Sequence, residues 1–118
     1  MRRYDVSDPF RPRLTGKVEL GGIYHRRRHP SGAELAGGPQ MLEVSRDGGR
    51  LYVTNSLYSS WDNQFYPEGI RGWMVKLDVG SGGGLSVDER FLVDFGDARA
   101  HQVRLQGGDA SSDSYCFP

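Results

Sequence analysis

The sequence predicts an all-β fold: part of a β-propeller, with about one complete four-stranded blade and two half-blades. Glycine accounts for 17 of the 118 residues, about twice its usual share of roughly 7%, which favours tight turns and therefore many short strands. Short segments of alternating apolar and polar residues are separated by turn residues, with almost no helical period. The order of these segments also repeats along the chain.

Two strands are predicted at the start of the chain. The first is Arg2–Val6, and "SDPFRP" ends it because proline and aspartate interrupt a strand ladder. The second is Arg13–Leu20, in which Leu14, Val18 and Leu20 are expected on one side. The following stretch, "GGIYHRRRHPSGAELAGGP", is predicted to be a long polar loop.

The clearest unit of the sequence is a hairpin in the middle of the chain. Strand Gln40–Val44, turn "SRDGG" and strand Arg50–Asn55 follow one another, and Asp-Gly between apolar runs is a strong hairpin signal. An aromatic-rich loop, "SLYSSWDNQFYPEGIRG", comes next. Helix is expected nowhere else, and here it amounts to one turn at most.

The second half of the chain predicts three more strands. Trp73–Val79 is a strand and "GSGGG" is a turn, since it lacks the helix and lysine of a phosphate-binding loop. The stretch Leu85–Phe95 holds a strand at its end, and "HQVRL" is the last strand of the chain.

The propeller interpretation rests on a repeat in this order. "RRYDVSDPFRPRLTGKVEL" and "WMVKLDVGSGGGLSVDERFLVDF" resemble one half-unit, and "GPQMLEVSRDGGRLYVTNS" and "ARAHQVRLQGGDASSDSYC" resemble the other. The copies lie about 60 residues apart, longer than the roughly 40–50 of common propeller repeats, and the two long loops account for the excess. Repeated four-stranded sheets indicate propeller blades. A small stand-alone sandwich or barrel is the alternative.

The predicted blades do not close a ring. The chain would supply the outer half of one blade, one whole blade and the inner half of another, which leaves sheet edges without partners. We therefore expect residues 1–118 to be the C-terminal segment of a larger propeller, whose remaining blades would be its partners.

Composition excludes several classes of function. Fifteen basic residues balance fifteen acidic ones, so no overall field attracts nucleic acid. No apolar run approaches the roughly 18 residues of a membrane span, and "MRRYDVSDPF" lacks the apolar core of a signal peptide. The single cysteine, Cys116, cannot form a disulfide within the chain.

Long and unusual motifs resemble one family. They are "DVSDPFRPRLTGKVELGG", "GGPQM", "RLYVTNSLYSSWDNQFYP", "FLVDFGDARAH" and "GGDASSD", in that order. Together they resemble the selenium-binding protein family, whose members include methanethiol oxidases and look like seven-bladed propellers of several hundred residues. The resemblance covers nearly the whole chain, apart from "IYHRRRHPSGAEL" and "YCFP".

The resemblance implies chemistry on a small thiol. It implies conversion of methanethiol, oxygen and water to formaldehyde, hydrogen sulfide and hydrogen peroxide, with copper held by histidines. The family's selenium-linked cysteine lies in its N-terminal part and has no counterpart here. The alternative is a truncated, non-catalytic propeller remnant, or a binding or scaffold module. The resemblance is compatible with a cytoplasmic or a periplasmic location.

The resemblance makes His101 the candidate metal ligand. Family members carry an Ala-His pair at this place, and an inner propeller strand lines the central channel. The alternative is a hydrogen-bonded structural histidine at a blade junction. His25 and His29 lie in an arginine-rich loop, where neighbouring cations disfavour a metal, so a solvated loop is expected there.

Four further residues are predicted to line a channel or pocket. Trp61 and Tyr66 belong to the aromatic loop and could shape an apolar pocket for a methyl group, or could equally pack that loop onto the blade. Asp62 is expected to make local polar contacts, and Gln40 to lie at the entry of an inner strand. "GGDASSD" is interpreted as a turn stabilised by side-chain to backbone hydrogen bonds, and Cys116 as a free thiol without a role in the site.

Overall fold

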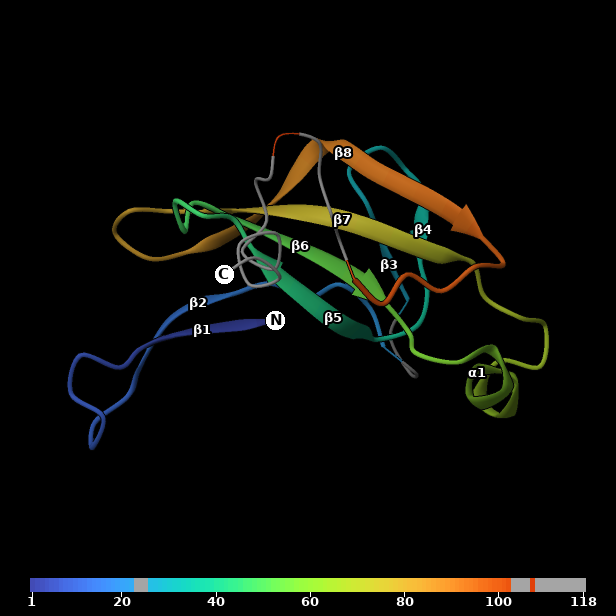
Figure 1. Ribbon diagram of the computed structural model, residues 1–118, viewed down its shortest axis with the longest axis horizontal. Coiled ribbons are helices and arrows are strands. Elements are labelled where there is room, and N and C mark those ends of the chain that lie inside the picture. The colour runs from blue at the N-terminus through green and yellow to red at the C-terminus, as the bar shows by residue number, and fades with distance from the viewer. Residues whose placement is uncertain (23–25, 103–106, 108–118) are drawn as a thin grey trace.

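The computed structural model describes residues 1–22, 26–102 and 107, and their fold is all-β with a single short helix (Figure 1). The elements are β1 (Arg2–Asp5), β2 (Arg13–Lys17), β3 (Arg27–Arg28), β4 (Glu34–Leu35), β5 (Pro39–Val44), β6 (Arg50–Asn55), α1 (Ser59–Phe65), β7 (Gly72–Val79) and β8 (Leu85–Gly96). Strands β5, β6, β7 and β8 form one antiparallel sheet in chain order, while β1 pairs with β2 and β3 with β4. Helix α1 lies at one end of the four-stranded sheet, and the β1–β2 hairpin extends from the other end.

The register of the large sheet gives it one strongly apolar face. Leu42 pairs with Val53, Val53 with Val75, and Val75 with Leu92, so one apolar row crosses all four strands. Directly paired residues of antiparallel strands share a face, and alternate residues along each strand point to opposite faces. The alternation of apolar residues in the sequence therefore sets the face that becomes the core.

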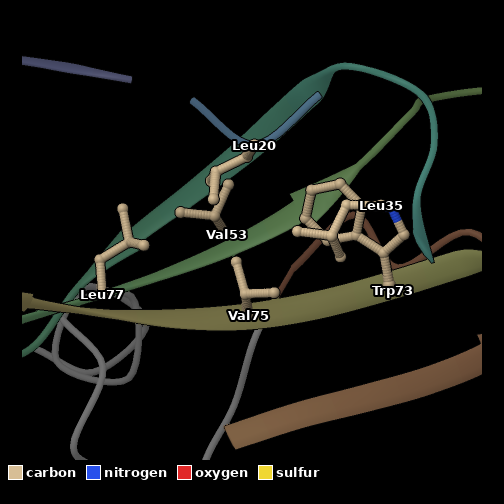
Figure 2. Packing of buried hydrophobic residues seen from close by; sticks show 6 residues of the cluster. All are labelled: Leu20, Leu35, Val53, Trp73, Val75 and Leu77. Carbon is tan, nitrogen blue, oxygen red and sulfur yellow. The ribbon is translucent and has the colours of Figure 1, made fainter. Parts of the chain in front are cut away.

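The core forms where the segment before β5 crosses this face. Leu20 and Leu35 are each 1% exposed and belong to the same cluster as Val53 and Val75, which are fully buried. Figure 2 shows Leu20 beside Val53 and Leu35 against the ring of Trp73. Burial of side chains of this size contributes about 1.5–3 kcal/mol each. The core is therefore a layer of apolar side chains between the sheet and the segment that precedes it.

The β1–β2 hairpin is attached to the sheet at the turn between β7 and β8. The Gly84 N–H donates to the Thr15 carbonyl at 2.8 Å, and Arg3 Nη1 donates to the Gly80 carbonyl at 2.8 Å. A Cβ on Gly16 would lie 2.9 Å from the Gly84 carbonyl carbon, so this contact brings two backbones together. The glycine-rich turn therefore provides a docking site for the hairpin as well as a reversal of the chain.

Several predicted elements are confirmed. The hairpin of β5 and β6 matches its predicted strands to within one residue, and β7 and the "GSGGG" turn lie where expected. Strands β1 and β2 pair, but β2 ends at Lys17, three residues before the predicted end, and Leu14 is 53% exposed and does not share the burial of Leu20.

Other predictions need correction. Strand β8 extends over the whole of Leu85–Gly96, not only its end, because the partner strand β7 provides pairing for most of that length. Helix α1 has seven residues, where one turn at most was predicted. His101 and Gln102 are not in a strand, and the rest of the predicted strand "HQVRL" lies outside the described residues.

The stretch predicted to be a long polar loop contains the short hairpin β3–β4 and a buried histidine. His29 is 2% exposed, its Nδ1 accepts a hydrogen bond from the Ser31 N–H at 3.1 Å, and its Nε2 donates to the Asp88 carbonyl at 3.0 Å. A solvated position for His29 was therefore wrong, since Nε2 holds this hairpin on β8 while Nδ1 is bonded within the hairpin itself. His25 lies outside the described residues.

The three arginines of this hairpin have local partners. Arg26 pairs with Glu34 at 3.0 Å, Arg27 pairs with Glu19, and Arg28 donates to the Gly32 carbonyl at 3.0 Å. Exposed pairs of this kind contribute little to stability.

In the part of the chain that the structure describes, no helix has the length and apolar character needed to cross a bilayer.

Candidate functional site

The candidate site begins where β6 ends. Asn55 is 1% exposed, and its side chain joins three backbone segments. Its Nδ2 donates to the carbonyls of Ala36 at 3.1 Å and Arg71 at 2.9 Å, and its Oδ1 accepts the Trp73 N–H at 2.7 Å. The Trp73 indole N–H also reaches the Ala36 carbonyl, at 2.8 Å. These bonds fix the direction in which the chain leaves the sheet.

The chain turns sharply at the next residue. Ser56 has a φ of 61°, in the left-handed region that residues other than glycine rarely adopt. Its N–H donates to the Gly38 carbonyl at 3.0 Å, and its hydroxyl donates to the Asp62 carboxylate. Strained conformations of this kind persist only when several contacts hold them. This turn carries Leu57 and Tyr58 across the end of the sheet and into α1.

Helix α1 directs one carboxylate into the protein. The Tyr58 carbonyl accepts the N–H groups of Trp61 and Asp62, both at 3.0 Å, which closes the first turn without a side-chain cap. Asp62 is the buried residue of this helix, while Trp61 and Phe65 lie on its exposed side. The helix therefore separates a polar inner contact from an aromatic outer surface.

Asp62 forms a buried ion pair with Arg99. Arg99 Nε donates to Asp62 Oδ2 at 2.8 Å, and both side chains are less than a tenth exposed. Arg99 Nη2 also donates to the Ile70 carbonyl at 2.9 Å. The two partners are 37 residues apart in the sequence. A buried pair that loses one partner leaves an uncompensated charge, so this contact ties α1 firmly to the segment before His101.

The segment that leads to His101 crosses the start of β7 closely. A Cβ on Gly72 would lie 2.0 Å from the Ala98 carbonyl oxygen, so a side chain at this position would displace the segment. Thr54 Oγ1 then donates to the Ala100 carbonyl at 2.8 Å. Together with Arg99, these contacts determine where His101 emerges.

The ring of His101 is exposed but anchored at one nitrogen. Its Nε2 bonds the Leu57 carbonyl, which can only accept, so Nε2 carries the proton. In the neutral ring, the lone pair then lies on Nδ1. The Tyr58 ring meets the imidazole edge-on, with the centroids 5.7 Å apart and the planes at 89°. A backbone carbonyl that binds one ring nitrogen is the usual support of a histidine whose other nitrogen binds a metal.

A pocket of about 440 Å³ lies beside this histidine. Its lining residues come from the start of β5, the turn after β6, and α1: Gly38, Pro39, Gln40, Ser56, Leu57, Tyr58, Trp61, Asp62, Phe65 and Tyr66. Burial raises the pKa of the Tyr66 phenol above its ordinary value of 10.0. That hydroxyl lies near the Gly37 N–H without completing a hydrogen bond of standard geometry. The pocket wall is mainly apolar, with four aromatic residues among its ten, and the polar side chains in it are those of Gln40, Ser56 and Asp62.

The four predicted lining residues lie around this one pocket. Gln40 is exposed on β5, Trp61 is 63% exposed on α1, and Asp62 and Tyr66 are buried. His101 is not part of the wall but contacts Leu57 and Tyr58, which are. The structure thus brings all five predicted residues to the same end of the sheet.

The sequence of this chain is similar to those of known proteins. A family model described as "56kDa selenium binding protein (SBP56)" matches residues 1–116. The chain belongs to the selenium-binding protein family. It is 46% identical over 138 aligned positions to methanethiol oxidase from Homo sapiens, and 41% identical to selenium-binding protein 3 from Arabidopsis thaliana, in each case over 96% of this chain.

A solved structure is more similar still. The X-ray structure of a hypothetical selenium-binding protein from Sulfolobus tokodaii is 71% identical, with a TM-score of 0.84 over 99% of this chain. The chain spans 29% of the length of the human methanethiol oxidase and 26% of the Sulfolobus chain. The chain therefore matches only part of the length of each of these members of the selenium-binding protein family.

Two residues of the candidate site in this member of the selenium-binding protein family, Ser56 and Arg99, were not predicted from the sequence. The hydroxyl of Ser56 matters because of a backbone conformation that no sequence pattern signals. Arg99 stands two residues before His101, and only the buried position of Asp62 makes it significant. Asp109, Asp113 and Cys116 lie outside the described residues.

Among the described residues of the site, one side chain is suited to bind a metal. His101 offers a nitrogen donor, which suits copper. Among the residues that the structure describes, no three His, Cys, Asp or Glu side chains are grouped as a metal site would need. In this member of the selenium-binding protein family, the described residues therefore offer one imidazole donor at this place.

Proposed function

We propose that this chain forms the C-terminal portion of a propeller of the selenium-binding protein family. The four-stranded antiparallel sheet in chain order is the type of sheet from which propeller blades are built. The separate β1–β2 pair supports a neighbouring blade that is only partly present. The relatives, more than three times as long as this chain, would supply the other blades.

We propose further that the complete protein oxidises a small thiol at the end of the sheet that carries His101. By analogy with relatives named methanethiol oxidase, methanethiol, oxygen and water would give formaldehyde, hydrogen sulfide and hydrogen peroxide. The observation that carries this proposal is the anchored imidazole of His101 beside an aromatic-lined pocket.

The pocket residues have distinct roles in this proposal. Tyr58, Trp61 and Phe65 provide apolar surface for the methyl group of the thiol. Gln40 adds a polar group at the pocket edge. His101 would hold copper through Nδ1, with the other ligands supplied from outside the described residues. Copper, when bound, supplies the one-electron and oxygen chemistry that protein side chains lack.

The test is His101→Ala in the full-length protein. Copper content and thiol-dependent peroxide production should both fall, the rate by more than about tenfold, because a metal ligand is lost. Gln102→Ala changes the exposed neighbouring residue and should leave both unchanged. Full copper and full rate in the His101 variant would contradict the assignment. A wild-type protein without copper or oxidation would favour a propeller that only binds partners.

A further inference from the structure

We propose that Asp62 is a positioning residue for His101: its carboxylate joins the two backbone segments whose contact fixes the imidazole. The use of this position in metal binding rests on the function proposed above. The positioning itself depends only on geometry within the described residues.

Each oxygen of the Asp62 carboxylate holds a different segment. Oδ1 accepts a hydrogen bond from the hydroxyl of Ser56, the residue that precedes Leu57. Oδ2 accepts Nε of Arg99 at 2.8 Å, and Arg99 lies two residues before His101. Asp62 therefore connects the segment that provides the Leu57 carbonyl with the segment that provides the imidazole.

The resulting contact determines which nitrogen of His101 is available. The hydrogen bond from Nε2 to the Leu57 carbonyl requires the two segments to approach each other. In the neutral ring, it leaves the lone pair on Nδ1, which is directed away from Leu57. If the segments separated, the exposed ring of His101 would turn freely and both nitrogens would meet water.

Burial of the Asp62 carboxylate makes its contacts with the two segments rigid. Asp62 is 5% exposed, and the hydrogen bonds of its carboxylate go to Ser56 and Arg99. Arg99 is held independently by the Ile70 carbonyl, and Thr54 holds the Ala100 carbonyl. An ion pair on the surface could not fix a segment in this way, because solvent screens it and side-chain entropy opposes it.

The test measures the His101 imidazole proton in the full-length protein without metal. Proton exchange at Nε2 with water is followed by NMR on protein labelled with ¹⁵N-histidine, together with the contact between the Tyr58 and His101 rings. In Asp62→Asn the carboxylate charge is lost, so exchange at Nε2 should become at least about tenfold faster and the ring contact should weaken. An unchanged exchange rate and ring contact in the folded variant would overturn the proposal.

Two further variants make the result decisive. Ser56→Gly removes one of the two hydrogen bonds, and glycine suits a φ of 61°, so this variant should fold even if Asp62→Asn does not. It should also speed exchange at His101. Asp94→Asn removes an exposed ion pair with Arg71 near the same end of the sheet and should change nothing at His101. Equal effects of Asp94→Asn and Asp62→Asn would overturn the proposal.

This test is independent of the copper test. Loss of ring anchoring in Asp62→Asn would stand even if His101→Ala retained copper, and in that case only the function proposed for the histidine would fail. Conversely, copper binding that depends on His101 with unaltered anchoring in Asp62→Asn would leave the function intact and remove the role of Asp62.

Discussion

At the scale of single residues, Asn55 has the widest structural influence near the site. Its amide uses both donors and its carbonyl oxygen, and so joins the segment before β5, the end of β6 and the start of β7. Buried amides of this kind are costly to remove because their partners lose hydrogen bonds in a place that water does not reach. Asn55 therefore supports the pocket without lining it.

We expect Asn55→Ala to lower the free energy of unfolding by roughly 2–4 kcal/mol, since the buried N–H of Trp73 and the carbonyl of Arg71 lose their partner. Urea denaturation monitored by tryptophan fluorescence measures the change. Asn63→Ala makes the same replacement at an exposed position of α1 and should stay within about 0.5 kcal/mol of the wild type. Similar losses in both variants would contradict the role of the Asn55 network.

His101 was identified from the family resemblance, Trp61 and Tyr66 from the aromatic-rich loop, and Gln40 from its place at the start of a predicted inner strand. The contacts of Asp62 were not accessible in the same way. Its partner Arg99 is 37 residues away, and the pairing depends on how the segment after β8 crosses β7. Such a crossing is a tertiary contact, and the residues near Asp62 in the sequence do not indicate it.

At the scale of elements, the same distinction separates correct from wrong predictions. The β5–β6 hairpin was predictable because its turn contains Asp-Gly and its strands alternate locally. The β3–β4 hairpin has two residue pairs only, and its position is set by Leu35 packing against the core. A ladder that short depends on tertiary contact, so the sequence of the hairpin itself looks like a loop.

The β5–β6 turn gives a prediction about acid. The hydroxyl of Ser45 donates to Asp47 at 2.6 Å and the Gly49 N–H donates at 2.9 Å, and these bonds lower the pKa of Asp47 from 3.8 to about 2. A carboxyl group whose pKa is lower in the folded state stabilises the fold above pH 3.8. That contribution is lost as the pH falls towards about 2.

Asp47→Asn should therefore reduce the loss of unfolding free energy between about pH 4 and pH 2, without abolishing it. The remainder is expected because Asp5, bonded by Ser7, and Glu19, paired with Lys17, also have their pKa lowered to about 2. Urea midpoints at a series of pH values measure the slope. Ser45→Ala removes the main hydrogen bond to Asp47 and should move the acid transition to higher pH. Superimposable pH curves for the wild type and Asp47→Asn would refute this account.

At the scale of the whole molecule, the edge strand β5 leaves part of the apolar face uncovered. Leu42 is 46% exposed and Val44 is 37% exposed, although they share a face with the buried Val53 and the partly buried Leu51. In the propeller proposed above, neighbouring structure would cover these side chains. An open apolar edge strand also tends to pair with other molecules.

Leu42→Lys should therefore have opposite effects in two contexts. In the separate 118-residue chain, it should reduce concentration-dependent association in sedimentation velocity, because a charge on an edge strand opposes pairing. In the full-length protein, it should lower stability by about 1–3 kcal/mol, because the proposed neighbouring blade would bury the same side chain. Gln64→Lys adds the same charge at an exposed position of α1 and serves as the control. A harmless Leu42→Lys in the full-length protein would argue against a covering blade.

The order β5, β6, β7, β8 has a consequence for how the molecule is made. Every strand of the sheet pairs with a strand next to it in sequence, and folds rich in such short-range pairings form quickly. The sheet can therefore be complete on the ribosome as soon as Gly96 has emerged, before Arg99 is available to meet Asp62. Residues 97–101 then add to a finished sheet, so changes among them should affect the stability of the folded protein more than the rate at which the sheet forms.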